Sequence, residues 1–187
     1  MLGAAALTLV LRETGATEAR IPVSGPGVVD HHGLEVEVSG DASRFDWSVA
    51  NTGDRPRSID AVGLEWDLPA GSGPVRMFVH GYQSWSPSGL RILGRDEDPS
   101  QHPDRLPFTG HVHHADPGTA EPGELRSEQV TVLDLADGGP RRCLGFLDGA
   151  SHAGTFRARR DGDQVRVRAE GWLGGAVLPA GAARTRP

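Results

Sequence analysis

Short stretches of alternating apolar and polar residues, interrupted by glycine and proline, constrain the fold of this chain more than any other feature. Side chains of a β-strand point alternately to its two faces, so such alternation predicts a strand with one buried face. The 26 glycines and 14 prolines among 187 residues predict many turns. No segment keeps a helical period over a helical length. We therefore expect an all-β protein, an antiparallel β-sandwich with little helix.

The clearest strand is predicted at residues 34–38, where leucine and valines alternate with two glutamates. A second lies at 59–68, with Val62, Leu64, Trp66 and Leu68 as its expected core face. Further strands are predicted at residues 1–11, 45–50, 75–85, 127–134, 142–147, 154–160, 164–170 and 172–178. Turns are predicted at residues 21–33, 51–56, 137–140 and 160–163, which are rich in Gly, Pro, Asn and Asp.

A single domain is expected over residues 1–187, with one irregular insertion at about 87–123. This span shows no periodicity and is dominated by Pro, Asp, His and Gly; loops of such length are usually functional or disordered. The chain is long enough to bury a core without disulfides or metals. Cys143 is the only cysteine, and its apolar neighbours Leu144 and Phe146 predict a buried thiol.

Charge and hydropathy exclude several classes of partner. A net charge of −6 without a basic run argues against nucleic-acid binding. No apolar run approaches the length of a membrane span, and the N-terminus lacks the charged region and cleavage site of a signal peptide. We therefore expect a cytoplasmic protein that binds neither nucleic acid nor membrane.

Histidines and consecutive charges in the sequence offer weaker candidate sites. His111 and His113 would share one face of a strand and could chelate an ion, with Asp116 nearby. No second cluster supplies further ligands, so a solvated histidine-rich loop is the favoured interpretation, and His31-His32 is a weaker case still. No metal and no cofactor are expected.

Two charged runs have similarly plain interpretations. Asp96, Glu97 and Asp98 are adjacent acids in a proline-rich loop, which are usually solvated rather than a catalytic pair. The arginines at 157–160 and 166–168 lie on predicted hairpin strands. They are expected to form an exposed polar face or a seat for an acidic partner surface.

Residues 78–87, with the sequence FVHGYQSWSP, carry the most informative chemistry. The run predicts the end of a strand that breaks into a loop after Trp85. Aromatic side chains with polar neighbours at a sheet rim suit the apolar faces and hydroxyl edges of a sugar, and loops on rigid scaffolds often carry binding groups.

Three pieces of the chain together resemble one family. They are GYQSWS at 81–86, LGFL at 144–147, and EGWL at 170–173 followed by LPAG at 178–181. In this order they resemble the N-terminal domain of family-36 α-galactosidases (melibiases), and the similarity covers nearly the whole chain. The resemblance implies a large galactose-mutarotase-like β-sandwich, or supersandwich, that precedes a (β/α)8 barrel.

The resemblance also implies roles for the motif. Trp85 would stack on galactose in the barrel of the same or a neighbouring subunit, while Tyr82, Gln83 and Ser84 would shape the loop that presents it. The two catalytic aspartates of the family lie on the barrel, and no residue of this chain corresponds to them. We therefore expect a non-catalytic domain of an enzyme that hydrolyses terminal α-galactosides with retention, with the barrel absent from this chain.

A free-standing carbohydrate-binding module is the alternative. The two hypotheses differ in the surface that they require. A domain that docks on a barrel should expose an apolar patch, whereas an independent module should not.

Overall fold

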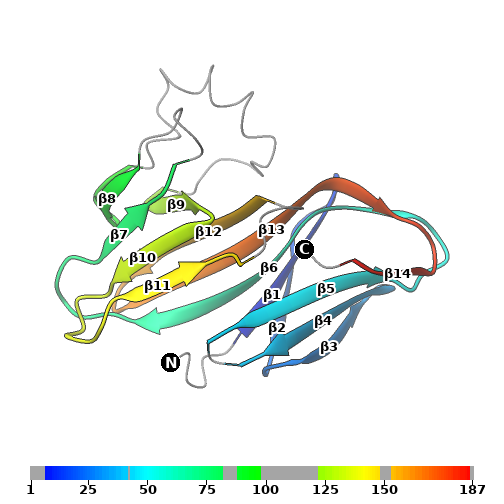
Figure 1. The fold of residues 1–187 in the computed structure, drawn as a ribbon, viewed down its shortest axis with the longest axis horizontal. Helices are drawn as coiled ribbons and strands as arrows, with labels where there is room; N and C mark the ends of the chain where they lie inside the picture. The colour runs from blue at the N-terminus through cyan, green and yellow to red at the C-terminus, as the bar shows by residue number, and fades with distance from the viewer. Residues whose placement is uncertain (1–6, 42, 82–87, 98–121, 148–152, 186–187) are drawn as a thin grey trace, which may run out of the picture. The chain divides into compact units, whose positions relative to one another are not determined.

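The computed structural model describes residues 7–41, 43–81, 88–97, 122–147 and 153–185, with the backbone course alone for 182–185. The described residues form strands β1 to β14 and no helix (Figure 1). Neighbouring strands pair in antiparallel fashion, which confirms the predicted all-β, antiparallel sandwich class. No helix in the described part of the chain is long and apolar enough to cross a membrane.

The chain divides into two compact units, which are described separately. Unit 1 comprises Met1–Trp66 and Gly171–Pro187, and unit 2 comprises Asp67–Glu170. The assignment of residues 1–187 to one domain stays a prediction.

Unit 1 contains two sheets. One has the strand order β14-β5-β4-β3, and the other is the β2-β1-β6-β13 part of a six-stranded sheet of order β2-β1-β6-β13-β12-β9. Their strands are β1 (Leu7–Glu13), β2 (Ala19–Val23), β3 (Gly27–His31), β4 (Leu34–Gly40), β5 (Phe45–Asn51), β6 (Arg57–Pro69), β13 (Gln164–Leu178) and β14 (Ala182–Thr185). The last parts of β6 and the first part of β13 belong to unit 2.

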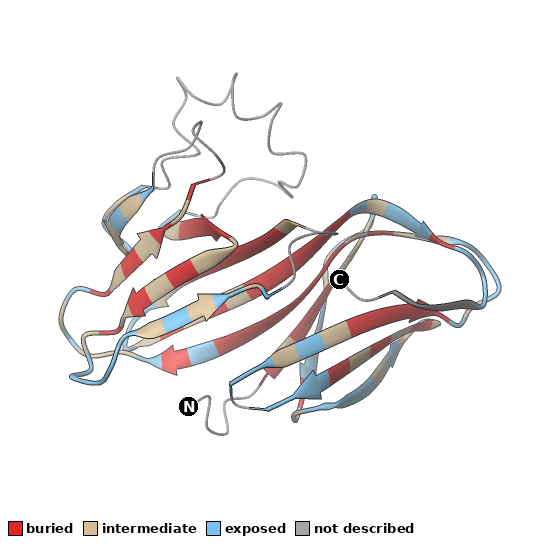
Figure 2. Ribbon diagram, viewed as in Figure 1, coloured by how far each residue is buried: buried red, intermediate tan, exposed pale blue. Residues whose placement is uncertain are grey.

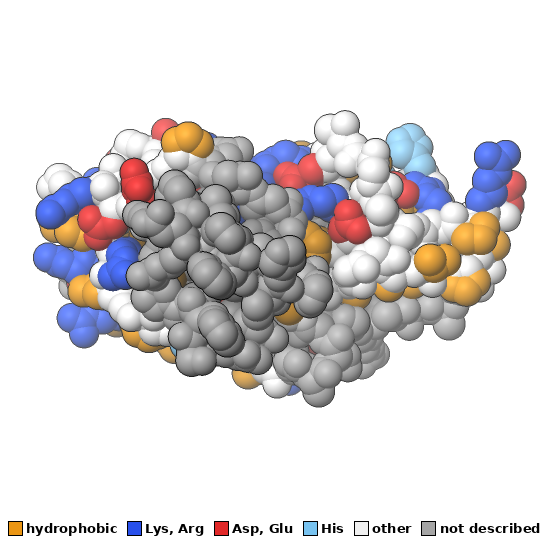
Figure 3. All heavy atoms as spheres, turned by 90° about the horizontal axis from the view of Figure 1, so that it is seen from above, with side chains coloured by type: hydrophobic (Ala, Val, Ile, Leu, Met, Phe, Trp, Pro, Cys, Tyr) orange, Lys and Arg blue, Asp and Glu red, His pale blue; other side chains and the backbone are white. Residues whose placement is uncertain are grey.

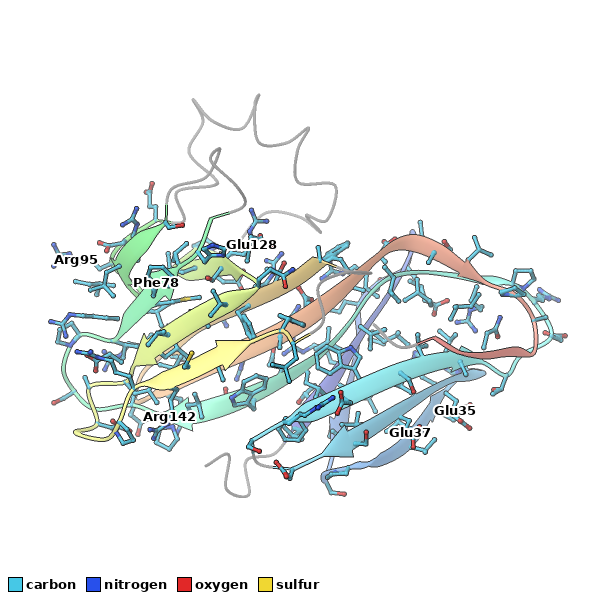
Figure 4. The ribbon with its side chains drawn as sticks, in the orientation of Figure 1. Glu35, Glu37, Phe78, Arg95, Glu128 and Arg142 are labelled. Carbon is cyan, nitrogen blue, oxygen red and sulfur yellow. The ribbon has the colours of Figure 1, made fainter. Side chains whose placement is uncertain are left out.

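Alternation sets the faces of β4 as predicted. Leu34, Val36 and Val38 are buried, whereas Glu35 and Glu37 lie on the opposite side (Figures 2 and 4). Strand β6 differs from the prediction, because both of its faces are buried. The expected core residue Leu64 is buried, but so is Ile59 of the other parity. A strand between two neighbours in a sheet can be covered on both sides, and its sequence then loses strict alternation.

The region predicted as one long turn, residues 21–33, is instead built of strands. Strands β2 and β3 occupy most of it, and β3 forms a hairpin with β4 through His32 and Gly33. Both turn residues have positive φ, 53° and 81°, the signature of a type I′ turn. His32 therefore has a structural position in a tight turn, next to the ring of His31.

Unit 2 also contains two sheets, which pack on each other. One has the order β11-β10-β7-β8, and the other is the β6-β13-β12-β9 part of the six-stranded sheet. Strands β7 and β10 contact β9, and β10 contacts β12. The strands new here are β7 (Arg76–Val79), β8 (Gly89–Ile92), β9 (Glu124–Glu128), β10 (Val130–Asp134), β11 (Arg142–Gly145) and β12 (Ala153–Asp161). The buried core includes Met77, Val79, Leu125, Leu133, Phe156, Ala158, Val165 and Val167.

Several predictions for unit 2 need correction. The span 127–134 is two strands, because Gln129 takes a positive φ of 63° and the chain changes sheets there. Strand β8 lies inside the span expected to be irregular, residues 87–123. Cys143 is exposed rather than buried, since its side of edge strand β11 faces away from the core.

Candidate functional site

The predicted sugar-contacting residues Tyr82, Gln83, Ser84 and Trp85 lie outside the described residues. The structure does describe both ends of the segment that carries them. Strand β7 ends at Val79 and pairs with β8, so that Val79 lies opposite Gly89. The motif is thus the connection of a β-hairpin, and the expected strand at 75–85 is shorter than predicted.

This connection is closed at its base by a hydrogen bond. The backbone N–H of Gly81 donates to the Ser88 hydroxyl oxygen, 3.0 Å away. Only residues 82–87 stand between these two groups. The ends of the motif are therefore held together by the chain's own atoms, at the sheet edge formed by β8.

His80, just before this base, is fixed to the neighbouring sheet. Its backbone N–H donates to Ser127 Oγ at 2.7 Å, and its carbonyl accepts from the Glu128 N–H at 2.8 Å. Its ring Nδ1 lies 2.8 Å from the Glu128 carbonyl oxygen. A carbonyl oxygen can only accept, so Nδ1 carries the proton. His80 was not singled out by the sequence, because its partners are non-local.

The partners of His80 lie at the corner where β9 becomes β10. Gln129 makes this corner: its N–H donates to Gly154 O at 2.8 Å, and its carbonyl accepts from Phe146 N–H at 2.9 Å. The hydroxyl of Ser127 is fully buried and donates to Val130 O. Ser127 lies between Arg126 and Glu128 in the sequence, so no local signal marked it as buried or located the corner.

An apolar row crosses the outer face of the four-stranded sheet. The register places Leu90 opposite Phe78, Phe78 opposite Val132, and Val132 opposite Cys143. Directly opposed residues share a face. Leu90 is 60% exposed and Cys143 is exposed, while Phe78 and Val132 are half-buried. We call these four residues the outer row; Figure 4 labels Phe78 on β7.

Arginine side chains accompany apolar ones on this part of the surface. Figure 3 shows both kinds at the left, the side on which Figure 1 places β7, β8, β10 and β11. Arg76 Nη1 lies 3.8 Å from Asp134 Oδ2. These two residues lie opposite each other on β7 and β10, two positions along from Phe78 and Val132. Ile92 lies opposite Arg76 on β8, so the row is bordered on that side by this ion pair and one further apolar residue.

The arginines predicted to form an exposed face or a seat for an acidic partner are largely engaged within unit 2. Arg157 is buried; it donates to Glu124 at 3.0 Å and lies 3.2 Å from Glu170. Arg160 donates to two backbone carbonyls, those of Gly71 and Gly73. The expectation of an exposed polar face is therefore wrong for the buried Arg157, whereas Arg160 is half-buried.

The other candidate sites gain no support as metal or catalytic centres. His111, His113 and Asp116, as well as Asp98, lie outside the described residues. Asp96 caps a turn, since its Oδ2 accepts the Ile92 N–H at 2.7 Å. Within the described ranges, no group of three or more His, Cys, Asp or Glu side chains is placed to hold a metal.

No protein-family model matches the sequence. A comparison with curated proteins finds no match either.

Proposed function

We propose that this chain is the non-catalytic N-terminal β-sandwich domain of an α-galactosidase-like retaining glycoside hydrolase. Its role is to support the catalytic barrel and to present Trp85 to the sugar site, in the same or a neighbouring subunit. The parent reaction is hydrolysis of terminal α-galactosides. It requires two carboxylates about 5–5.5 Å apart, which the proposal assigns to the barrel and to no residue of this chain.

The observation that carries the proposal is the anchored base of the motif. A hydrogen bond between Gly81 and Ser88 holds the ends of the connection between β7 and β8 together. The neighbouring residue His80 is hydrogen-bonded to Ser127. Both ends of the connection that contains Trp85 are thus fixed by described residues. Covering the C–H face of a pyranose with an indole contributes on the order of 1.5–3 kcal/mol to the free energy of sugar binding.

The outer row supports a docking role. Leu90 and Phe78 belong to the same hairpin as the motif, so a domain seated on the row would lie beside the connection that carries Trp85. Exposed apolar side chains gathered on one face mark interaction surfaces more often than isolated ones do. The outer row therefore supports the enzyme-domain hypothesis.

The test uses the chain joined to an α-galactosidase barrel. Trp85→Ala should lower kcat/KM on an aryl α-galactoside by roughly 10-fold to 150-fold, the equivalent of the indole contact. Trp47→Phe, at a half-buried position of β5 in unit 1, is the matched control and should leave kcat/KM unchanged. An unchanged kcat/KM for Trp85→Ala would remove the sugar-wall role.

A free-standing carbohydrate-binding module is the second candidate, favoured by one observation. Gly81 and His80, at the start of the motif, are hydrogen-bonded to Ser88 and Glu128 of this chain, and these contacts need no barrel. Leu90→Ser separates the two functions. It should weaken association with a barrel while leaving sugar binding by the isolated chain intact. If the isolated chain binds α-galactosides and no barrel associates with it, the module is the correct description.

A further inference from the structure

We propose that the outer row, together with Arg76, Asp134 and Arg141, forms a docking surface for a different protein that presents apolar side chains with a carboxylate beside them. It rests on the proposed function only in naming a catalytic barrel as the expected partner. The surface consists of described residues alone and can be tested without a barrel.

The apolar part of this surface crosses all four strands of the sheet. The outer row runs from Leu90 on β8 through β7 and β10 to Cys143 on β11. Adjacent strands lie about 4.8 Å apart, so the row is about 14 Å long. The exposed side of β11 continues to Leu147, because residues 141, 143, 145 and 147 are exposed and those between them are half-buried. A partner with a row of apolar side chains can therefore contact every strand of the sheet.

Charged side chains lie beside the outer row. Arg76 and Asp134 are opposite each other on β7 and β10, and Arg141 approaches Asp134 from the start of β11. Two residues along a strand span about 6.6 Å, which sets the separation from the outer row. We call Arg76, Asp134 and Arg141 the charged row.

The two arginines of the charged row keep hydrogen-bonding capacity for a further acceptor. Arg76 Nη1 and Arg141 Nε each lie 3.8 Å from the same oxygen, Oδ2 of Asp134, which is beyond hydrogen-bond range. Within the described part of the chain, neither guanidinium donates a hydrogen bond. Asp134 Oδ1 already accepts from the Ala136 N–H at 3.2 Å. A carboxylate of a partner suits these guanidinium groups, because it can accept two of their N–H bonds at once.

Exposure places the positive charge outermost. The side chain of Arg141 is 75% exposed and that of Arg76 42%, against 33% for Asp134. Two arginines and one aspartate give the charged row a net charge of +1, whereas the whole chain carries −6. Charge complementarity therefore favours an acidic partner at this surface.

A second copy of this chain is a poorer occupant. In a symmetric dimer the same surface faces itself. Each copy would bring two arginines, and the one carboxylate of its charged row already lies between them. Like charges would meet across the interface and disfavour association. The surface therefore fits a different protein.

The test uses two synthetic dodecapeptides as probes, one of alternating leucine and glutamate and one of alternating leucine and lysine. Binding to the full chain is followed in ¹H–¹⁵N spectra. The leucine–glutamate peptide should bind and shift the amide signals of β7, β8, β10 and β11, whereas the leucine–lysine peptide should not. No binding of the leucine–glutamate peptide, or equal binding of both, would overturn the proposal. So would a wild-type dimer in sedimentation that Leu90→Ser abolishes.

Four substitutions separate the parts of the surface. Leu90→Ser should weaken binding of the leucine–glutamate peptide roughly fivefold to 30-fold, and Arg141→Gln roughly 1.5-fold to fivefold. Asp134→Asn should strengthen it, because the change removes the carboxylate that competes for both arginines. Arg55→Gln, at an exposed position before β6, is the matched control and should have no effect. Weaker binding in Asp134→Asn would contradict the role of the charged row even if another variant failed to fold.

An α-galactosidase barrel, added as a separate chain, distinguishes this surface from the proposed function. If the barrel binds, competes with the leucine–glutamate peptide and loses affinity in Arg141→Gln, both proposals are supported. If the peptide binds as expected and the barrel does not, docking on a barrel fails while the chemistry of the surface stands. If the barrel binds and the peptide does not, the surface proposal fails and the proposed function stands.

Discussion

Arg157 and Glu170 form a buried ion pair, with Nε of the arginine 3.2 Å from Oε2 of the glutamate. Glu170 is fully buried and also accepts a hydrogen bond from Arg168, at 3.2 Å. These side chains project from the face of β12 and β13 opposite the core residues Val167 and Phe156. Unit 2 thus buries charge on one side of this sheet and apolar side chains on the other.

Removing one member of this pair should lower the free energy of unfolding. Glu170→Gln removes a buried carboxylate that lies close to both Arg157 and Arg168. Breaking a buried pair costs about 3–5 kcal/mol, and the effect should lie at the lower end because Glu124 stays beside Arg157. Urea denaturation measures the free energy of unfolding. Asp67→Asn is the control, because the Arg166–Asp67 pair is exposed by 37% and 48% and should contribute only about 0–1 kcal/mol. If both substitutions lowered the free energy of unfolding by the same amount, burial would not explain the contribution of the Arg157–Glu170 pair.

Gly71→Ala should destabilise the protein because there is no room for a Cβ. The added atom would lie 1.7 Å from the backbone oxygen of Ala136, which cannot move as a side chain can. Overpacking costs about 1–3 kcal/mol, and a backbone clash belongs at the upper end. Gly27→Ala, with no atom within 4 Å of its Cβ, should leave the melting temperature unchanged or slightly raised. A melting temperature for Gly71→Ala equal to that of wild type would contradict the clash.

His32→Asn should stabilise the hairpin of β3 and β4. His32 holds a φ of 53°, which asparagine tolerates better, and Asn-Gly is the preferred pair for a type I′ turn. We expect a gain of about 0.5–1 kcal/mol in chemical denaturation. His31→Asn serves as control, since that residue is in β3 and should gain nothing from the change. A loss of stability in His32→Asn would show that the contact between the two histidine rings outweighs the turn preference.

Asp41 should make the stability of unit 1 depend on pH in the acid range. Hydrogen bonds from the Ser43 hydroxyl and from the backbone N–H groups of Ser43 and Arg44 lower the pKa of Asp41 below its usual 3.8. A carboxyl group whose folded pKa is lowered stabilises the folded state above its unfolded pKa, and this contribution disappears as the pH falls through the folded pKa. Asp41→Asn should therefore lower the melting temperature at pH 7 but make no difference near pH 2. A difference that persists at pH 2 would assign the effect to something other than the charge.

Local sequence chemistry was sufficient to predict much of the fold. The hairpin turns at 137–140 and 160–163 lie between strands as expected, because glycine and aspartate determine such turns within a few residues. The alternation of Leu34, Val36 and Val38 likewise gave the correct buried face. Both signals are local, so no tertiary information is needed to interpret them.

The strands that the sequence did not reveal share one property. Strands β2, β3, β8 and β14 each lie at the edge of a sheet. An edge strand has one partner, can be short, and tolerates residues that a central strand excludes. Pro22 in β2 is an example, opposite Thr8 of β1. Edge strands therefore resemble loops in sequence, and β8 was hidden within a span that looked irregular.

The candidate site was only partly predictable for a related reason. The motif is contiguous in sequence and could be recognised, whereas the partners of His80 lie 47 and 48 residues away. The buried Arg157 and Glu170 alternate with apolar residues, as surface charges of a strand also do. Sequence alternation distinguishes the two faces of a strand but not whether the polar face is covered.

Cys143 makes the outer row observable without any substitution. It is the only cysteine of the chain, it is exposed, and it lies opposite Val132 in that row. A thiol-directed fluorophore or spin label would therefore attach at one known position on the surface proposed to receive a barrel. Loss of label mobility on mixing with a candidate partner would report occupancy of that surface directly, in the native sequence.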